Sequence, residues 1–222
     1  MTGAALRSYR ADSWIRRADE LAKPDDNKSE RELKSILDER FIFYWIGLNA
    51  LYGQAKYRQE KLERTPELVD LVEFVRLMHR LDRSQALTKT LSDLTDQKYR
   101  LLGDCFLDDR CWKVWDKKGL VDQDARERSS TLSPNAQFEL EELFKKLYVL
   151  RKQIFHGCAT RGSSKTGMAV KDAVAVLERF LPILRNIVKS SEAGERLLNY
   201  PPYPPSEDRK NSGAEVRKRR RT

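Results

Sequence analysis

The chain has 222 residues, which suits one domain of about 150–200 residues with terminal segments. Apolar residues make up 40% of it and charged residues 35%, so we expect a core beneath a charged surface and no membrane span. The net charge of +9 favours a polyanionic partner such as nucleic acid, because attraction to phosphate supplies most non-specific affinity.

The N-terminal third is predicted to be helical after a flexible start. Residues 1–12 are expected to be a flexible N-terminus. A short amphipathic helix is predicted from Ser13 to Ala22, because the residue before Pro24 is pushed out of the helical region. A long helix or helix pair should follow from Ser29 to Arg58. Its centre, RFIFYWIGLNALYG, is apolar on nearly every face, so we expect other helices to surround it.

Two helix starts share one signature, a hydroxyl residue followed by proline. Thr65-Pro66-Glu67 supplies an N-cap, a proline at the first helical position and a carboxylate in the first turn, and predicts a helix to Leu81. One or two further helices are expected over residues 84–115, with breaks at Gly103 and at residues 108–109. The polar segment 119–132 is expected to be a loop. Ser133-Pro134 predicts the second such start.

The helix after Ser133 carries the clearest periodicity. Leucine and isoleucine recur at alternating spacings of three and four, which indicates a seam against a partner helix. These residues are Leu140, Leu143, Leu147, Leu150 and Ile154. Gly157 is the natural residue to end this helix. A flexible, partly basic loop is expected over residues 158–167.

A final helix is predicted from Met168 to Ser191, kinked at Pro182. The segment YPPYPPS cannot be helical, and the chain closes with VRKRRRT, so residues 196–222 are expected to be an extended or disordered basic tail. Residues 207–222 carry a net charge of +4, so about half of the basic excess remains on the helical domain of residues 13–195. The fold class is therefore all-α, with a tail.

The segment LYVLRKQIFHG, residues 147–157, holds the best candidate site. Arg151 presents a planar cationic fork that suits phosphate, and His156 can move a proton near neutral pH. Positions five apart lie about 140° apart around a helix, so the two side chains need a second subunit or a distorted last turn to converge. A C-terminal histidine cap and an arginine ion pair are the structural alternatives.

Three cysteines and the lack of a secretory pattern near Met1 predict reduced thiols in a cytoplasmic protein. A structural zinc site would need four closely spaced ligands, so we expect no metal. No cofactor is expected either.

The Arg151–His156 segment resembles the signature of the HEPN (higher eukaryotes and prokaryotes nucleotide-binding) superfamily: arginine, a polar residue, further residues, then histidine. Residues 40–53 are similar to the aromatic Asn-Ala-Leu-Tyr helix of its Apea-like branch. The resemblance implies an antiparallel bundle of four to five helices that dimerises. It also implies a metal-independent endoribonuclease whose Arg151 and His156 meet in a homodimer cleft.

Such proteins act as toxins, in antiviral defence or in RNA processing, so RNA and an antitoxin or regulatory protein are the implied partners. Lys152 and Gln153 are candidate RNA contacts, while Asn49, Tyr52 and Tyr148 are candidate supporting residues. For Asn49, burial between helices is the structural alternative, and for both tyrosines it is packing. Lys152 stands where the family usually has Asn, Asp or His, and it cannot accept a hydrogen bond. A non-catalytic HEPN module that binds RNA or a partner protein is therefore the alternative function, and a purely structural helical dimer is a third.

Overall fold

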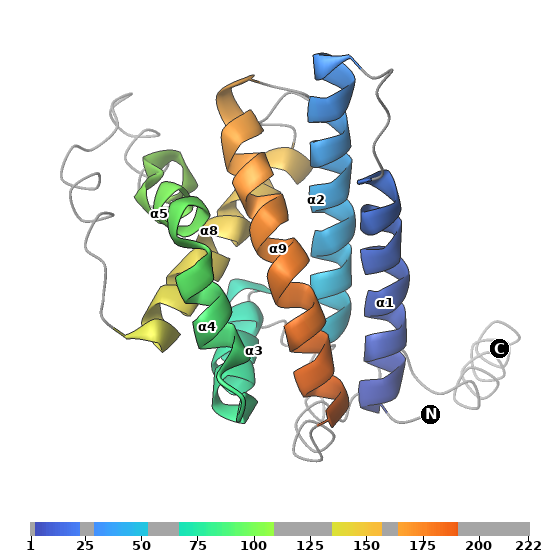
Figure 1. Cartoon of the computed structure of the whole chain (residues 1–222), viewed down its shortest axis with the longest axis vertical. Helices are drawn as coiled ribbons and strands as arrows, with labels where there is room; N and C mark the ends of the chain where they lie inside the picture. The colour runs from blue at the N-terminus through green and yellow to red at the C-terminus, as the bar shows by residue number, and fades with distance from the viewer. Residues whose placement is uncertain (1–2, 23–28, 53–66, 109–134, 157–163, 191–222) are drawn as a thin grey trace, which may run out of the picture.

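Figure 1 shows the computed structural model, which describes residues 3–22, 29–52, 67–108, 135–156 and 164–190. These residues form seven α-helices and one short 3₁₀ helix, without a strand. Five of the helices have 15 or more residues. The prediction of an all-α helical bundle is confirmed for this part of the chain.

Helices α1 (Gly3–Leu21) and α2 (Glu30–Tyr52) lie side by side and antiparallel, and α9 (Ser164–Ser190) packs along α2 (Figure 1). The prediction of a flexible segment over residues 1–12 is wrong for residues 3–12, because α1 already begins at Gly3. Arg7 and Ala11 are fully buried, and Arg7 Nη1 donates a hydrogen bond of 3.1 Å to the carbonyl of Leu51 near the end of α2. This bond satisfies one of the backbone carbonyls that a helix end leaves unpaired.

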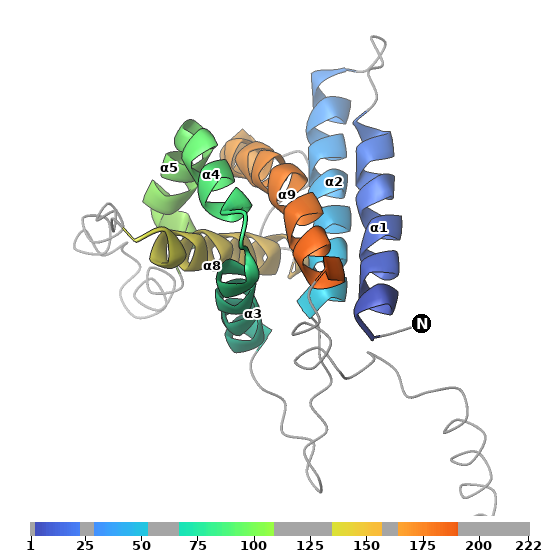
Figure 2. The ribbon, with the colours of Figure 1, turned by 60° about the horizontal axis from the view of Figure 1, so that its bottom comes forward.

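Helix α3 (Glu67–Leu81) packs against α8 (Ala136–Phe155), and the short helices α4 (Ala86–Asp93) and α5 (Thr95–Gly103) cover α8 and α9. The 3₁₀ helix η1 (Cys105–Leu107) follows α5 and contacts α8. Figures 1 and 2 show that α8 crosses α9 at an angle, whereas α1 and α2 lie alongside each other with opposite chain directions. The ends predicted at Leu81 and Gly103 are both confirmed.

The core forms where the predicted apolar rows meet. On α2, Phe41, Trp45, Leu48 and Tyr52 are buried. The leucine row of α8 is buried too, apart from the partly buried Ile154. The inner face of α9 is buried throughout: Val170, Val174, Leu177, Leu181, Leu184 and Val188. The leucine seam of α8 therefore packs within its own chain, which takes it out of consideration as a groove for a second subunit.

Two helices begin at residues other than those predicted. Helix α8 begins at Ala136 with Asn135 as its N-cap, two residues after the expected Ser133-Pro134 start. Helix α9 begins at Ser164, four residues before Met168, and contains Pro182. Several predicted features lie outside the described residues: the Thr65-Pro66 cap, residues 53–58, the loops over 119–132 and 158–163, Gly157 and the tail over 196–222.

Candidate functional site

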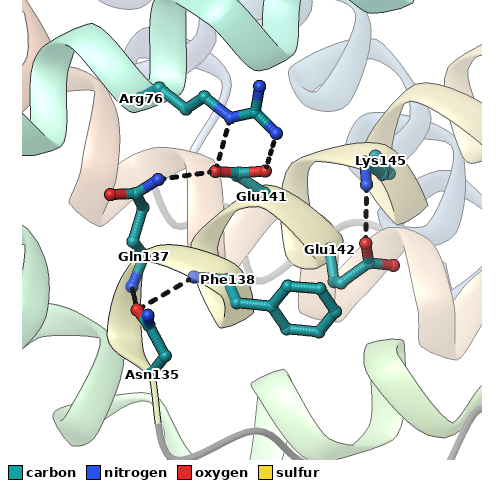
Figure 3. A network of polar contacts seen from close by, with 7 residues as sticks. All are labelled: Arg76, Asn135, Gln137, Phe138, Glu141, Glu142 and Lys145. Atoms are coloured by element: carbon teal, nitrogen blue, oxygen red, sulfur yellow. Dashed lines mark hydrogen bonds and ion pairs between the residues drawn. The ribbon is translucent and has the colours of Figure 1, made fainter.

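The candidate site lies at the C-terminal end of α8. The helix is fixed at its start by Asn135, whose side-chain oxygen accepts hydrogen bonds from the backbone N–H groups of Gln137 and Phe138 (Figure 3). It ends with His156 as the C-cap, where the backbone N–H of His156 bonds to the carbonyl of Lys152 at 3.0 Å. The side chain of His156 is exposed to solvent.

Arg151 contacts one carboxylate and one aromatic ring. Its Nη1 lies 3.3 Å from Oε2 of Glu67, the first residue of α3, and its guanidinium carbon lies 4.9 Å from the centre of the Phe155 ring. The Arg151 side chain is 21% exposed. Its Nε is buried and has no hydrogen-bond partner among the described residues. The guanidinium is thus held by charge and by an aromatic face.

Other arginines that pair with a carboxylate on another helix are held differently. Arg40, Arg76, Arg100 and Arg185 donate hydrogen bonds of 2.6–2.9 Å to their carboxylates. Arg76 and Arg100 do so with two nitrogens each, and their partners Glu141 and Asp172 are buried. Arg151 approaches Glu67 without such a bond. Its N–H donors are therefore the least used of this group: Nη1 lies in the ion pair with Glu67, and Nε is buried without an acceptor.

Three further predicted residues lie around the same junction. Tyr52, on the last turn of α2, is buried and donates a 3.0 Å hydrogen bond from its hydroxyl to Oε1 of Glu67. Tyr148 packs its ring 6.2 Å from Trp45, and Nζ of Lys152 lies 5.8 Å from the Tyr148 ring centre. Packing, the structural alternative for both tyrosines, describes their rings, while the Tyr52 hydroxyl bonds to a carboxylate.

Burial raises the pKa of the Tyr52 hydroxyl, and the neighbouring Glu67 carboxylate raises it further through its charge and its hydrogen bond. Arg151 acts in the opposite direction, but with a smaller effect. Tyr52 therefore remains a neutral hydrogen-bond donor at physiological pH, and it anchors Glu67 from the side opposite Arg151.

The structure does not bring His156 to Arg151. No hydrogen bond, ion pair or ring contact joins them in the part of the chain described, because α8 stays regular to Phe155 and five residues correspond to about 140° of rotation. Within one chain, the regular helix keeps the two side chains apart.

Gln153 and Asn49 have surroundings other than those expected. Gln153 is buried, and its amide donates a 2.7 Å hydrogen bond to the carbonyl of Phe106 in η1. It therefore joins η1 to α8, and its expected role as an RNA contact is replaced by a structural one. Asn49 is exposed on α2, so the alternative of a buried asparagine bonding between helices is wrong.

Sequence reasoning missed the two residues that hold Arg151. The sequence identifies Glu67 only as a first-turn carboxylate and does not single out Phe155. A cation four residues before an aromatic residue on one helix is a readable local signal for the Phe155 contact. The Glu67 contact depends on how α3 packs on α8, which the local sequence does not encode.

A second polar cluster links α1, α2 and α9 and has a structural role. Arg40 is buried and donates to Glu178 at 2.9 Å and to the Tyr44 hydroxyl at 3.2 Å, while the Tyr44 hydroxyl donates to Asp19. Burial and the Asp19 hydrogen bond raise the pKa of Tyr44. Arg40 is paired with Glu178 on α9, and Tyr44 links it to Asp19 on α1, so this cluster fastens the three helices together.

Among the described residues, no group of three or more His, Cys, Asp or Glu side chains is arranged to hold a metal ion. No helix in the described ranges is both long and apolar enough to cross a bilayer. Comparison of the chain with protein-family models, with curated proteins and with solved structures finds no match.

Proposed function

We propose that the chain is a metal-independent endoribonuclease of the HEPN type, with Arg151 as phosphate clamp and His156 as proton-transfer group. The observation that carries the proposal is the guanidinium of Arg151, which is partly buried, aimed by Glu67 and Phe155, and short of hydrogen-bond acceptors. Such a group is preorganised for the charge that develops on a phosphodiester. The net charge of +9 suits an RNA substrate.

The reaction is a transfer within the RNA chain. The ribose 2′-oxygen attacks phosphorus as His156 takes its proton, and the bond from phosphorus to the 5′-oxygen breaks. A second imidazole gives a proton to that leaving oxygen. The products are a 2′,3′-cyclic phosphate and a free 5′-hydroxyl, and Arg151 stabilises the charge on the phosphoryl oxygens.

Two copies of the chain would supply the pair of imidazoles. His156 is exposed at the tip of α8 and does not contact Arg151 of its own chain, so a homodimer cleft is the arrangement that brings both groups to one phosphate. Phe155 beside it is 45% exposed and offers an apolar contact for a partner. A role in the cytoplasm as a toxin, in antiviral defence or in RNA processing, restrained by an antitoxin or regulatory protein, accompanies this proposal.

The test is cleavage of structured and unstructured RNA by the purified protein in EDTA. We expect wild type to cut, and His156→Ala and Arg151→Ala each to lose about 100-fold or more in rate, as is usual for a proton-transfer group and a charge-stabilising donor. His79→Ala and the exposed Arg179→Ala are matched controls that should cut normally. Cleavage that EDTA abolishes, or that survives in Arg151→Ala, would contradict the proposal.

A non-catalytic module that binds RNA or a partner protein is the second candidate. It is favoured by the ion pair that Glu67 already makes with Arg151, and by the position of Lys152 over the Tyr148 ring. RNA binding that weakens with salt, together with no cleavage by wild type, would select this function over the first.

A further inference from the structure

The carboxylate of Glu67 lies between two donors of unequal strength. Oε1 accepts a hydrogen bond of 3.0 Å from the buried hydroxyl of Tyr52, whereas Oε2 lies 3.3 Å from Nη1 of Arg151 in an ion pair without hydrogen-bond geometry. Glu67 is also the first residue of α3, where the partial positive charge of the helix start favours a carboxylate. Glu67 is therefore anchored independently of Arg151.

Arg151 is anchored less firmly. Its guanidinium lies against the Phe155 ring, and its Nε has no acceptor. Charge-assisted hydrogen bonds to phosphate oxygens are stronger than an ion pair that lacks them, and a guanidinium can make two such bonds in parallel. An RNA phosphate can therefore draw Arg151 away while Tyr52 and the start of α3 retain Glu67.

We propose that Glu67 is an affinity-determining residue of the site: its carboxylate occupies Arg151 in the free protein and must be displaced by the RNA phosphate. This inference rests on the proposed function. The burial of Tyr52, which keeps its hydroxyl neutral, supports it because a neutral hydroxyl continues to hold Glu67 after the exchange. Arg151 then exchanges one anion for another, and the carboxylate lowers RNA affinity by the free energy of the ion pair it gives up.

The experiment measures the dissociation constant of fluorescein-labelled, 2′-O-methylated single-stranded RNA by anisotropy in EDTA, so that binding is read without cleavage. The Glu67→Gln variant removes the charge but keeps an oxygen that can accept from Tyr52. We expect it to bind about fivefold more tightly than wild type, which corresponds to about 1 kcal/mol, the upper end for a partly exposed ion pair.

The double variant Glu67→Gln/Arg151→Ala identifies the route of the effect. We expect it to bind no more tightly than Arg151→Ala alone, because Glu67 acts on RNA through Arg151. The matched control is Glu178→Gln, which makes the same charge change at the ion pair of another interhelical arginine, Arg40, and should not tighten binding. Unfolding curves of all variants verify that each is folded at the assay temperature.

The outcomes separate the two proposals. If Arg151→Ala weakens binding but Glu67→Gln binds no more tightly than Glu178→Gln, Glu67 is not a competitor and this inference falls while the Arg151 site stands. If Arg151→Ala binds as wild type does, or no variant binds RNA, both fall. If Glu67→Gln binds more tightly only when Arg151 is present, and unmodified RNA is not cut, this inference stands and the nuclease proposal falls.

Discussion

Glu141 shows what a structural arginine contact looks like in this protein. Arg76 Nε and Nη2 donate to the two Glu141 oxygens at 2.8 Å, and Gln137 Nε2 donates to Oε1 at 3.0 Å (Figure 3). Glu141 is 4% exposed, so this network replaces water that the carboxylate has lost. It joins α3 to α8, and Arg151 joins the same two helices with far fewer bonds.

Arg76 also makes the stability of the protein depend on pH. Its hydrogen bonds hold the pKa of Glu141 below its ordinary value of 4.5. A carboxyl group with a depressed folded pKa stabilises the fold above its ordinary pKa, and this contribution is lost as the pH falls through the folded pKa.

We predict that Arg76→Ala destabilises the protein by about 1–2 kcal/mol at pH 7, at the low end for a charged hydrogen bond because Arg76 is half exposed. The difference from wild type should shrink as both are unfolded in urea at successively lower pH below 4.5, because Glu141 becomes protonated as the pH falls through its folded pKa. A difference that stays the same at every pH would show that the charge of Glu141 plays no part.

At the residue scale, sequence reasoning found Arg151, Tyr52 and Tyr148 as residues of one region, and they do lie at one junction. It could not find Glu67, since Tyr52, Glu67 and Arg151 come from three helices whose packing sets the contacts. The contact of Gln153 could not be predicted either. Its side chain donates to the carbonyl of Phe106, which lies in a 3₁₀ helix too short to show an apolar periodicity.

At the scale of helices, the leucine row predicted for α8 and most of the apolar centre predicted for α2 are buried. Helix α1 was underestimated because its first turns carry Arg7, Arg10 and Asp12, which look like surface residues. Long-range contacts explain them: Arg7 bonds the carbonyl of Leu51, and Asp12 accepts a 2.6 Å hydrogen bond from Arg185. The start of α8 shifted because Asn135 caps as well as Ser133 would.

We predict that deleting residues 1–12 lowers the melting temperature by at least about 5 °C, because the deletion exposes the face of α2 that Arg7 and Ala11 cover. Circular dichroism against temperature measures it. If the truncated protein melts at the wild-type temperature, the first half of α1 contributes nothing to the bundle.

Two of the helical glycines, Gly47 and Gly103, should respond to substitution in opposite directions. A Cβ at Gly103 would meet nothing within 4 Å, so Gly103→Ala should stabilise the protein by about 0.5–1 kcal/mol through helix propensity. A Cβ at Gly47 would lie 3.2 Å from Cγ1 of Ile15, so Gly47→Leu should force α1 from α2 and cost about 1–3 kcal/mol. Urea unfolding of both variants tests the α1–α2 approach; a neutral Gly47→Leu would contradict it.

On the scale of the whole molecule, α9 is the helix around which the others are arranged. It contacts α1, α2, α3, α4, α5 and α8, and ion pairs from Arg100 to Asp172, Arg185 to Asp12 and Arg40 to Glu178 fasten three neighbours to it. This scaffold fixes the end of α2 and the start of α3 relative to α8. This packing places Glu67 beside Arg151, whereas Phe155 contacts Arg151 from one turn further along α8.

The charge of the whole chain predicts how RNA affinity depends on salt. The dissociation constant for RNA should rise steeply between 50 and 200 mM salt, because lysine and arginine side chains that bind phosphate release counterions from the RNA. Removing residues 207–222, with their net charge of +4, should make this salt dependence less steep. The truncated protein should still cleave RNA. Cleavage lost on truncation would place essential groups in that segment instead.

In the proposed reaction, Arg151 and His156 promote attack by a ribose 2′-hydroxyl. The decisive experiment compares the cleavage rate, in EDTA, of an RNA and of the same sequence with every 2′-hydroxyl methylated. We predict that wild type cuts only the first, leaving a 2′,3′-cyclic phosphate, and that Arg151→Ala cuts neither at a comparable rate. Equal cleavage of both substrates, or no cleavage of any RNA, would contradict it.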